Sequence, residues 1–304
     1  MLRPGIKLGC DWRARPEWSR LLAGSQDLPE ALKGLGITHA EFAFWRRDST
    51  ARWEPGREAE LVFEAAKDLI FKGFKVYLHP YVHQDRRGPG YLGEPGDEVV
   101  TSHLEQAIDL ASRLAGMQGS RGLLVFHAAD APRPESTGSG GDAGWRAELL
   151  LRSQAFFRHA DAYIRRTGAD VAVVCENPPP RASRIRIGES PEELLRVVEG
   201  TSFGVCLDVG HYRLCADLGL APHLPPPELM RRVEHVHLHS ARQGVDHLPA
   251  HLGARYLRRR LAELRALGKE LGVTLEYDYG DGGEEDPLSV LECISQGVRT
   301  VLAA

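Results

Sequence analysis

The chain has 304 residues, of which 42% are hydrophobic and 26% are charged, and its formal net charge is −4. This composition is typical of a globular protein with a sizeable core, and the charge balance gives no overall basic field for nucleic acid or an anionic membrane. No apolar run approaches the ~20 residues of a membrane span, and no signal peptide is recognised. The five cysteines form no CxxC pair, so we expect a reduced, cytoplasmic protein with no membrane partner.

Short apolar runs alternate with helical patterns along the whole chain. The predicted strands are residues 6–10, 39–45, 75–79, 122–127, 171–176, 203–208, 235–239 and 272–277. Strands that alternate with helices form parallel sheets, and eight such units are the count of a (β/α)8 barrel. A doubly wound open sheet usually has a glycine-rich turn after its first strand, and GCDWRARPEW has none. We therefore predict an α/β protein in which residues 1–304 form a single TIM-barrel domain.

Capping patterns and helical spacing predict several helix boundaries. Ser102 and Ser190 each precede a glutamate by three residues, which predicts that both serines are helix N-caps. Leucines at helical spacing over 257–271 predict a helix that ends at Gly272.

The predicted strands end on histidine, aspartate or glutamate. These residues, at or just after the ends of the third to eighth strands, are His79, His127, Glu176, Asp208, His211, His237, Asp246, His247 and Glu276. In a parallel barrel the carboxyl ends of all strands meet at one face, so these side chains can be aimed at a common point. Burying Asp208 without a partner would cost at least ~2–7 kcal/mol, and a cation removes this cost. Imidazole and carboxylate together suit zinc, manganese, cobalt or iron, so we predict a divalent-metal site.

The other histidines are interpreted separately. Alternation places His235, His237 and His239 on one side of the seventh strand, and we choose His237 as the ligand. The other two are interpreted as outer contacts of the site or as surface residues. A single strand-end histidine or acid is commonly a core residue or a helix cap, so the metal prediction depends on six consecutive strand ends. The histidines interpreted as ordinary surface or helix residues are His39, His103, His159 and His223.

Four stretches of the sequence resemble a known family. VCENPP, GVCLDVGH, HVHLHS with DHLP, and TLEY resemble the strand-5 to strand-8 signatures of the xylose isomerase-like TIM barrels. This superfamily includes sugar and sugar-phosphate isomerases and epimerases, and the endonuclease IV type of apurinic-site nuclease. The resemblance covers essentially the whole chain, although only these motifs are sharp. It implies a divalent metal (Mn, Co, Mg or Zn) whose ligands would be Glu176, Asp208, His237 and Glu276.

The nuclease branch implies further ligands and two or three zinc ions. Its additional histidines after strands 3, 4 and 6 match His79, His127 and His211. Its Asp-x-His after strand 7 has no clean match, because Asp246 and His247 are adjacent here, so a third metal site stays open. The stretch LGCDW also replaces a Gly-Ala-His type motif, and ENPPP replaces Glu-Asn-Thr. The ligand set therefore resembles the nucleases, whereas the flanking sequence is closer to the isomerases.

Three functions remain open. The first is a metal-dependent isomerase or epimerase of sugars or sugar phosphates, in which Glu176 and Glu276 transfer a proton next to a carbonyl and His211 orients the substrate. The second is an endonuclease IV-like zinc phosphodiesterase with DNA as its partner, although the basic run 255–265 is expected on the outer wall of the barrel. The third is a metal-stabilised barrel with neither activity.

Substrate contacts are expected from a polar strand residue and from loops. The candidates are Glu41, Arg86, Arg87 and Arg242. The long Gly/Pro-rich loops 83–98 and 128–144 are expected to lie over the mouth of the barrel and to set substrate choice. Apolar helix faces in this architecture often pair, so a homo-oligomer is compatible with the sequence.

Overall fold

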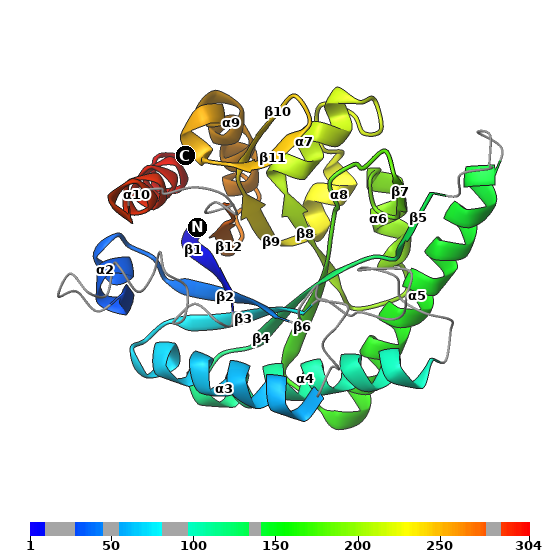
Figure 1. The fold of residues 1–304 in the computed structure, drawn as a ribbon, viewed down its shortest axis with the longest axis horizontal. Helices are drawn as coiled ribbons and strands as arrows, with labels where there is room; N and C mark the ends of the chain where they lie inside the picture. Colours follow the sequence, from blue (N-terminus) through cyan, green and yellow to red (C-terminus); the bar gives the residue numbers. More distant parts are fainter. Residues whose placement is uncertain (10–27, 45–54, 81–96, 134–140, 278–286) are drawn as a thin grey trace.

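A barrel of parallel strands forms the centre of the structure. The computed structural model describes residues 1–9, 28–44, 55–80, 97–133, 141–277 and 287–304. Its barrel strands are β1 (Leu2–Gly9), β2 (His39–Phe44), β3 (Lys75–Pro80), β4 (Gly122–His127), β6 (Val171–Glu176), β8 (Gly204–Asp208), β9 (Val233–Leu238) and β12 (Leu271–Leu275). These eight described strands close in the order β1-β12-β9-β8-β6-β4-β3-β2, each parallel to its neighbours (Figure 1). The predicted (β/α)8 TIM barrel is confirmed.

Helices cover the outside of the barrel (Figure 1). Their bounds are α2 (Leu28–Gly34), α3 (Pro55–Phe71), α4 (Glu98–Gln118), α5 (Gly141–Thr167), α6 (Pro191–Val197), α7 (Val209–Asp217), α8 (Pro227–Arg232), α9 (Ala254–Arg265) and α10 (Pro287–Ala303). The connections contain the 3-10 helix η1 (Ala250–Gly253) and two small sheets, β5 (Asp130–Pro132) with β7 (Arg184–Arg186) and β10 (Ser240–Arg242) with β11 (Val245–Leu248). Of the helices that the structure describes, none is long and apolar enough to cross a bilayer.

The barrel interior is apolar on one side and polar on the other. Successive side chains of a strand point alternately toward the helices and into the barrel. An apolar cluster that includes Val125, Val174 and Cys206 lies on β4, β6 and β8. On β2 and β9, buried polar side chains such as Glu41 and His237 take positions where TIM barrels usually carry branched aliphatic residues. Ionisable side chains are therefore buried inside this barrel, in place of part of its apolar core.

Two of the predicted helix boundaries are wrong and one is confirmed. The Ser190 hydroxyl accepts a hydrogen bond from the Glu193 amide at the start of α6, as predicted. Helix α4 begins before Ser102, because the Asp97 carboxylate accepts hydrogen bonds from the first free amides of that helix. Gly272 does not end α9 but lies within β12, where a Cβ would lie 2.9 Å from the His235 ring. This glycine makes room for a buried imidazole.

Gly5→Ala is expected to destabilise the barrel by about 1–3 kcal/mol, because the added methyl group would overlap the His39 ring inside it. Gly116→Ala is the matched control, since this α4 glycine is exposed and its Cβ would meet open space. It should stabilise the protein by about 0.5–1 kcal/mol. Urea unfolding of the metal-free proteins measures both effects, and a neutral Gly5→Ala would contradict the packing described here.

Candidate metal centre

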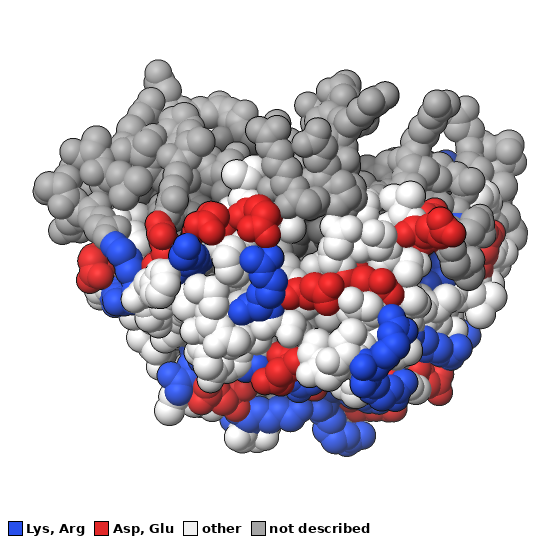
Figure 2. Space-filling model, turned by 90° about the horizontal axis from the view of Figure 1, so that it is seen from below, with Lys and Arg blue, Asp and Glu red and all other residues white. Residues whose placement is uncertain are grey.

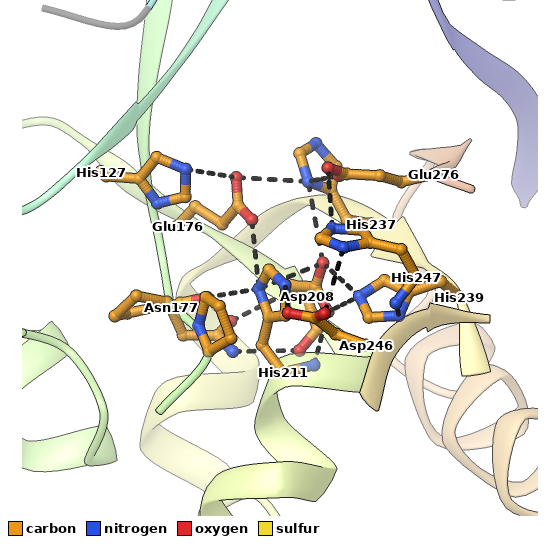
Figure 3. A network of polar contacts seen from close by, with 12 residues as sticks. His127, Glu176, Asn177, Asp208, His211, His237, His239, Asp246, His247 and Glu276 are labelled. Carbon is orange, nitrogen blue, oxygen red and sulfur yellow. Dashed lines mark hydrogen bonds and ion pairs between the residues drawn. The ribbon is translucent and has the colours of Figure 1, made fainter. Parts of the chain in front are cut away.

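Four buried side chains converge at the carboxyl ends of the strands (Figure 3). Glu176 ends β6, Asp208 ends β8, His237 lies in β9 and Glu276 directly follows β12. One nitrogen or carboxylate oxygen from each lies within 4.8 Å of the others. His237 Nδ1 is 3.2 Å from Glu176 Oε2, 2.9 Å from Glu276 Oε2 and 4.0 Å from Asp208 Oδ2. The structure thus brings together the four residues that the sequence offers as ligands.

The chemistry of this cluster fits a divalent cation. Both carboxylate oxygens of Glu176, Oε2 of Glu276 and Nδ1 of His237 are buried and make no hydrogen bond among the described residues. Burying polar atoms in this way costs several kcal/mol each unless a cation or hydrogen bonds compensate. One imidazole and three carboxylates are a ligand set that suits manganese, cobalt, magnesium or zinc.

The pKa values of Glu176 and His237 are shifted by the charges around them, and a bound cation would take the place of a proton. Burial alone would raise the pKa of Glu176, but the neighbouring His237 holds that pKa well below its usual range. Burial would lower the pKa of His237, but Cys206 and the surrounding carboxylates raise it well above its ordinary value. The surrounding carboxylates therefore favour a proton on His237 in the metal-free protein. Metal binding has to displace this proton.

A second group of possible ligands shares Glu176 with the first. His79 on β3 and His127 at the end of β4 approach the same carboxylate oxygen, with Nε2 to Glu176 Oε2 distances of 3.5 Å and 3.8 Å. The three side chains offer ligand atoms within 4.8 Å of one another. Burial lowers the pKa of His127 to about 3, so that its ring is neutral and able to bind a metal.

A third group lies at the start of α7 and on the β10–β11 hairpin. The Asp208 carboxylate caps α7 by accepting a hydrogen bond from the His211 amide at 2.7 Å. His211 Nε2 is 3.9 Å from Asp246 Oδ2, and His247 Nδ1 is 3.6 Å from Asp246 Oδ1. Burial would lower the pKa of His247, but Asp246 and Glu276 raise it to about 10. The adjacent Asp246 and His247 therefore both reach the site, although their spacing departs from the family pattern.

Three residues of the centre lie beyond the ligands chosen from the sequence. Lys7 Nζ on β1 is 2.6 Å from Glu276 Oε1, and a lysine within an apolar run is a signal that could have found it. The Asn177 side chain accepts from the Asp208 amide and donates to the Asp208 carbonyl, at 2.8 Å and 3.0 Å. His239 Nε2 is 2.9 Å from Asp208 Oδ1, so this histidine orients the aspartate.

The structure distinguishes between the interpretations of the other histidines. His235 and His239 are fully buried contacts of the site and not surface residues. The expectation for His39 is wrong, because this residue is buried inside the barrel and contacts Thr274. Alternation along β2 sends its side chain to the same side as Glu41. His103 is a buried residue of α4, so only its helical placement is correct.

The expected substrate-contact residues lie in different places. Glu41 is fully buried beneath the His237 ring, with its carboxylate on three histidines. Arg242 is exposed at the end of β10. Arg86 and Arg87 fall outside the described residues, as do residues 83–96 of the first long loop and 134–140 of the second.

Comparisons with known proteins agree with this architecture. The family described as a xylose isomerase-like TIM barrel matches residues 29–294. Among solved structures, a xylose isomerase domain protein from Alicyclobacillus acidocaldarius is 16% identical, with a TM-score of 0.60 over 99% of this chain and 98% of that one. Endonuclease IV from Thermus thermophilus is 19% identical, with a TM-score of 0.52 over 97% and 99% of the two chains.

A D-allulose 3-epimerase from Methylomonas sp. is 12% identical, with a TM-score of 0.53 over 99% of this chain and 96% of that one. At these identities the likeness to solved structures shows the fold alone. No curated protein matches the sequence.

Proposed function

The chain belongs to the xylose isomerase-like TIM barrel family, and from this premise we propose that it is a metal-dependent isomerase or epimerase of a sugar or sugar phosphate. The family comprises sugar isomerases and epimerases together with endonuclease IV-like enzymes. The observation that carries the proposal is the buried cluster of Glu176, Asp208, His237 and Glu276, in which several carboxylate oxygens and one ring nitrogen face one another without a hydrogen bond among the described residues. Three carboxylates and one imidazole favour manganese, cobalt or magnesium over a zinc site rich in histidine or cysteine.

The side chains of the cluster suit proton transfer beside a carbonyl. A divalent cation bound here would polarise a carbonyl oxygen and stabilise negative charge that develops next to it. Glu176 ends β6 and Glu276 follows β12, two strands that β8 and β9 separate, and one carboxylate can remove a proton from carbon while the other returns it. Lys7 and His237 hold the pKa of Glu276 well below its usual range despite its burial, so its charged form is favoured.

His211 supports the same chemistry from the start of α7. Its Nδ1 is 3.1 Å from the Asn177 carbonyl, which fixes the ring, and the buried Nε2 makes no hydrogen bond among the described residues. A ring held in this way can bind and orient a substrate oxygen, because its second nitrogen remains available.

A zinc phosphodiesterase is the second candidate. The group formed by His79, His127 and Glu176 favours it, because a site with a single cation does not need these two histidines. Two adjacent cations could activate water and clamp a phosphate diester. DNA would then be the partner, and binding would depend on lysine and arginine contacts to phosphate.

On one side of the barrel, the described surface adds no support for a DNA partner. Figure 2 shows one side of the barrel, where acidic and basic side chains are interspersed. On α3 and α4, basic side chains pair with neighbouring acids: Arg113 with Glu60 at 2.9 Å and Lys67 with Glu64 at 3.4 Å. The basic run of α9 lies on the outside of the barrel (Figure 1), as the sequence predicts.

The metal content of purified protein tests the proposal and separates the two candidates. We expect one divalent cation per chain, retained in His127→Ala and in the control His159→Ala, whose ring pairs with Glu105 on the helical exterior. The isomerase should also exchange substrate protons with heavy water when offered a panel of sugars and sugar phosphates. Two or more zinc ions, with one lost in His127→Ala, would instead support the phosphodiesterase. A wild-type protein that binds no cation after metal supplementation would overturn both candidates in favour of a barrel without either activity.

A further inference from the structure

One carboxylate inside the barrel contacts three histidines. Glu41 on β2 is fully buried, and its Oε2 lies 2.9 Å from His237 Nε2 and 3.0 Å from His235 Nε2. Its Oε1 lies 3.1 Å from His79 Nδ1. In the barrel, β1 and β12 separate β2 from β9, so the contacts to His235 and His237 cross the interior. Glu41 therefore acts on side chains of several strands at once.

Two of these imidazoles lie between Glu41 and Glu176. The His237 ring presents Nε2 to Glu41 and Nδ1 to Glu176 Oε2, at 2.9 Å and 3.2 Å. The His79 ring is placed in the opposite sense, with Nδ1 toward Glu41 and Nε2 toward Glu176 Oε2, at 3.1 Å and 3.5 Å. Both rings thus connect the same two carboxylates, one through each oxygen of Glu41.

An ionised carboxylate can only accept hydrogen bonds, so each ring nitrogen that faces Glu41 has to carry a hydrogen. In a neutral imidazole the other nitrogen then has a free lone pair. We propose that Glu41 is a positioning residue that fixes opposite tautomers in two histidines: Nε2–H in His237 and Nδ1–H in His79. The lone pairs of both rings are thereby directed to the Glu176 side of the site. The inference rests on the proposed metal-dependent function, since its consequence is a preformed set of ligand nitrogens.

The surroundings of Glu41 support its role as an anion in a fixed position. Three imidazole nitrogens face the two oxygens of the Glu41 carboxylate, at 2.9–3.1 Å. Lys7 Nζ lies 3.9 Å from its Oε1, and the Thr274 hydroxyl lies 3.4 Å from its Oε2. The carboxylate has no exposure to solvent, so its effect on a substrate would pass through the ligands.

Glu41→Gln is the matched test, because an amide has the same shape but carries no charge and exposes an N–H group to one of the two rings. We expect it to weaken the binding of Mn²⁺ or Zn²⁺ by about 10–100-fold in a chelator competition assay. Asp161→Asn is the control: this carboxylate of α5 is equally buried and accepts from the Ser202 hydroxyl, away from the site. It should leave the metal affinity unchanged, whatever it does to the unfolding midpoint.

The tautomers themselves provide a second readout that needs no variant. In ¹⁵N-histidine NMR spectra of the zinc-loaded protein, the proton of the neutral ring should be on Nε2 in His237 and on Nδ1 in His79. The inference would be overturned if both rings carried their proton on the same nitrogen, or if Glu41→Gln bound the metal as tightly as the wild type. The metal-dependent function would stand in either case. A wild-type protein that binds no cation would instead overturn the proposed function.

Discussion

Asp208→Asn is expected to weaken metal binding more than about 100-fold, beyond the loss that outer contacts of a metal site usually cause. The neutral amide removes one of the three carboxylates that face His237 Nδ1. Asparagine is as good a helix N-cap as aspartate, so the cap on the His211 amide should be kept. Isothermal titration with Mn²⁺ or Zn²⁺, together with urea unfolding of the metal-free protein, measures the two effects separately.

Asp208→Ala is the comparison that separates binding from folding. Alanine removes the cap as well as the ligand, so the metal-free variant should lose a further 0.5–2 kcal/mol of stability, or about 1 kcal/mol in a typical case. It also leaves His239 without its carboxylate partner. If Asp208→Asn bound the cation as tightly as the wild type, Asp208 would be only a cap, and the metal assignment of this strand end would be wrong.

Glu176→Gln is expected to reduce turnover by about 10³-fold or more, since general acid–base catalysis alone contributes about 10²–10⁴-fold. Glu176 also offers both carboxylate oxygens to the proposed cation, and neither has a hydrogen bond among the described residues. The assay is proton exchange between substrate and heavy water at saturating metal, so that weaker metal binding does not account for the loss. Glu192→Gln, at an exposed position of α6, is the control and should be fully active.

A Glu176→Gln enzyme that kept more than about a tenth of the wild-type exchange rate would exclude Glu176 as a proton-transfer group. Activity on a phosphodiester substrate, lost in Glu176→Gln and also in His127→Ala, would point instead to the second candidate function.

The strand ends were the most predictable part of the molecule. Glu176, Asp208 and His127 are the last residues of β6, β8 and β4, as the apolar runs predict. A parallel barrel then leaves one face where these side chains can meet. The site could be predicted because histidine, aspartate or glutamate recurs at the ends of successive strands. Each of these residues alone has an ordinary structural explanation.

Contacts across the barrel interior could not be predicted in the same way. Periodicity shows that Glu41 and His237 each point into the barrel, but it does not show that they touch. That contact depends on the register with which β1 closes against β12, in which Ile6 aligns with Leu275. A different stagger of the closed sheet would give Glu41 other neighbours.

The start of α4 and the position of the His39 ring were also not predicted correctly from the sequence. Ser102 has the correct spacing for a capping box, yet Asp97 provides the earlier and charged cap of α4. His39 looks like a surface residue because it begins a strand, but Gly5 and Gly272 leave space for its ring inside the barrel. Such space comes from neighbouring strands and cannot be read from the segment that contains the histidine.

The contact between Lys7 and Glu276 has a consequence for biosynthesis. These residues lie 269 positions apart in the sequence and meet only where the first and last barrel strands join. Because a polypeptide is made from its N-terminus, Lys7 and the candidate ligands Glu176, Asp208 and His237 leave the ribosome before Glu276. The complete ligand set therefore forms only after the last strand has docked, and incorporation of the proposed cation would be a late, post-translational step that selects fully closed barrels.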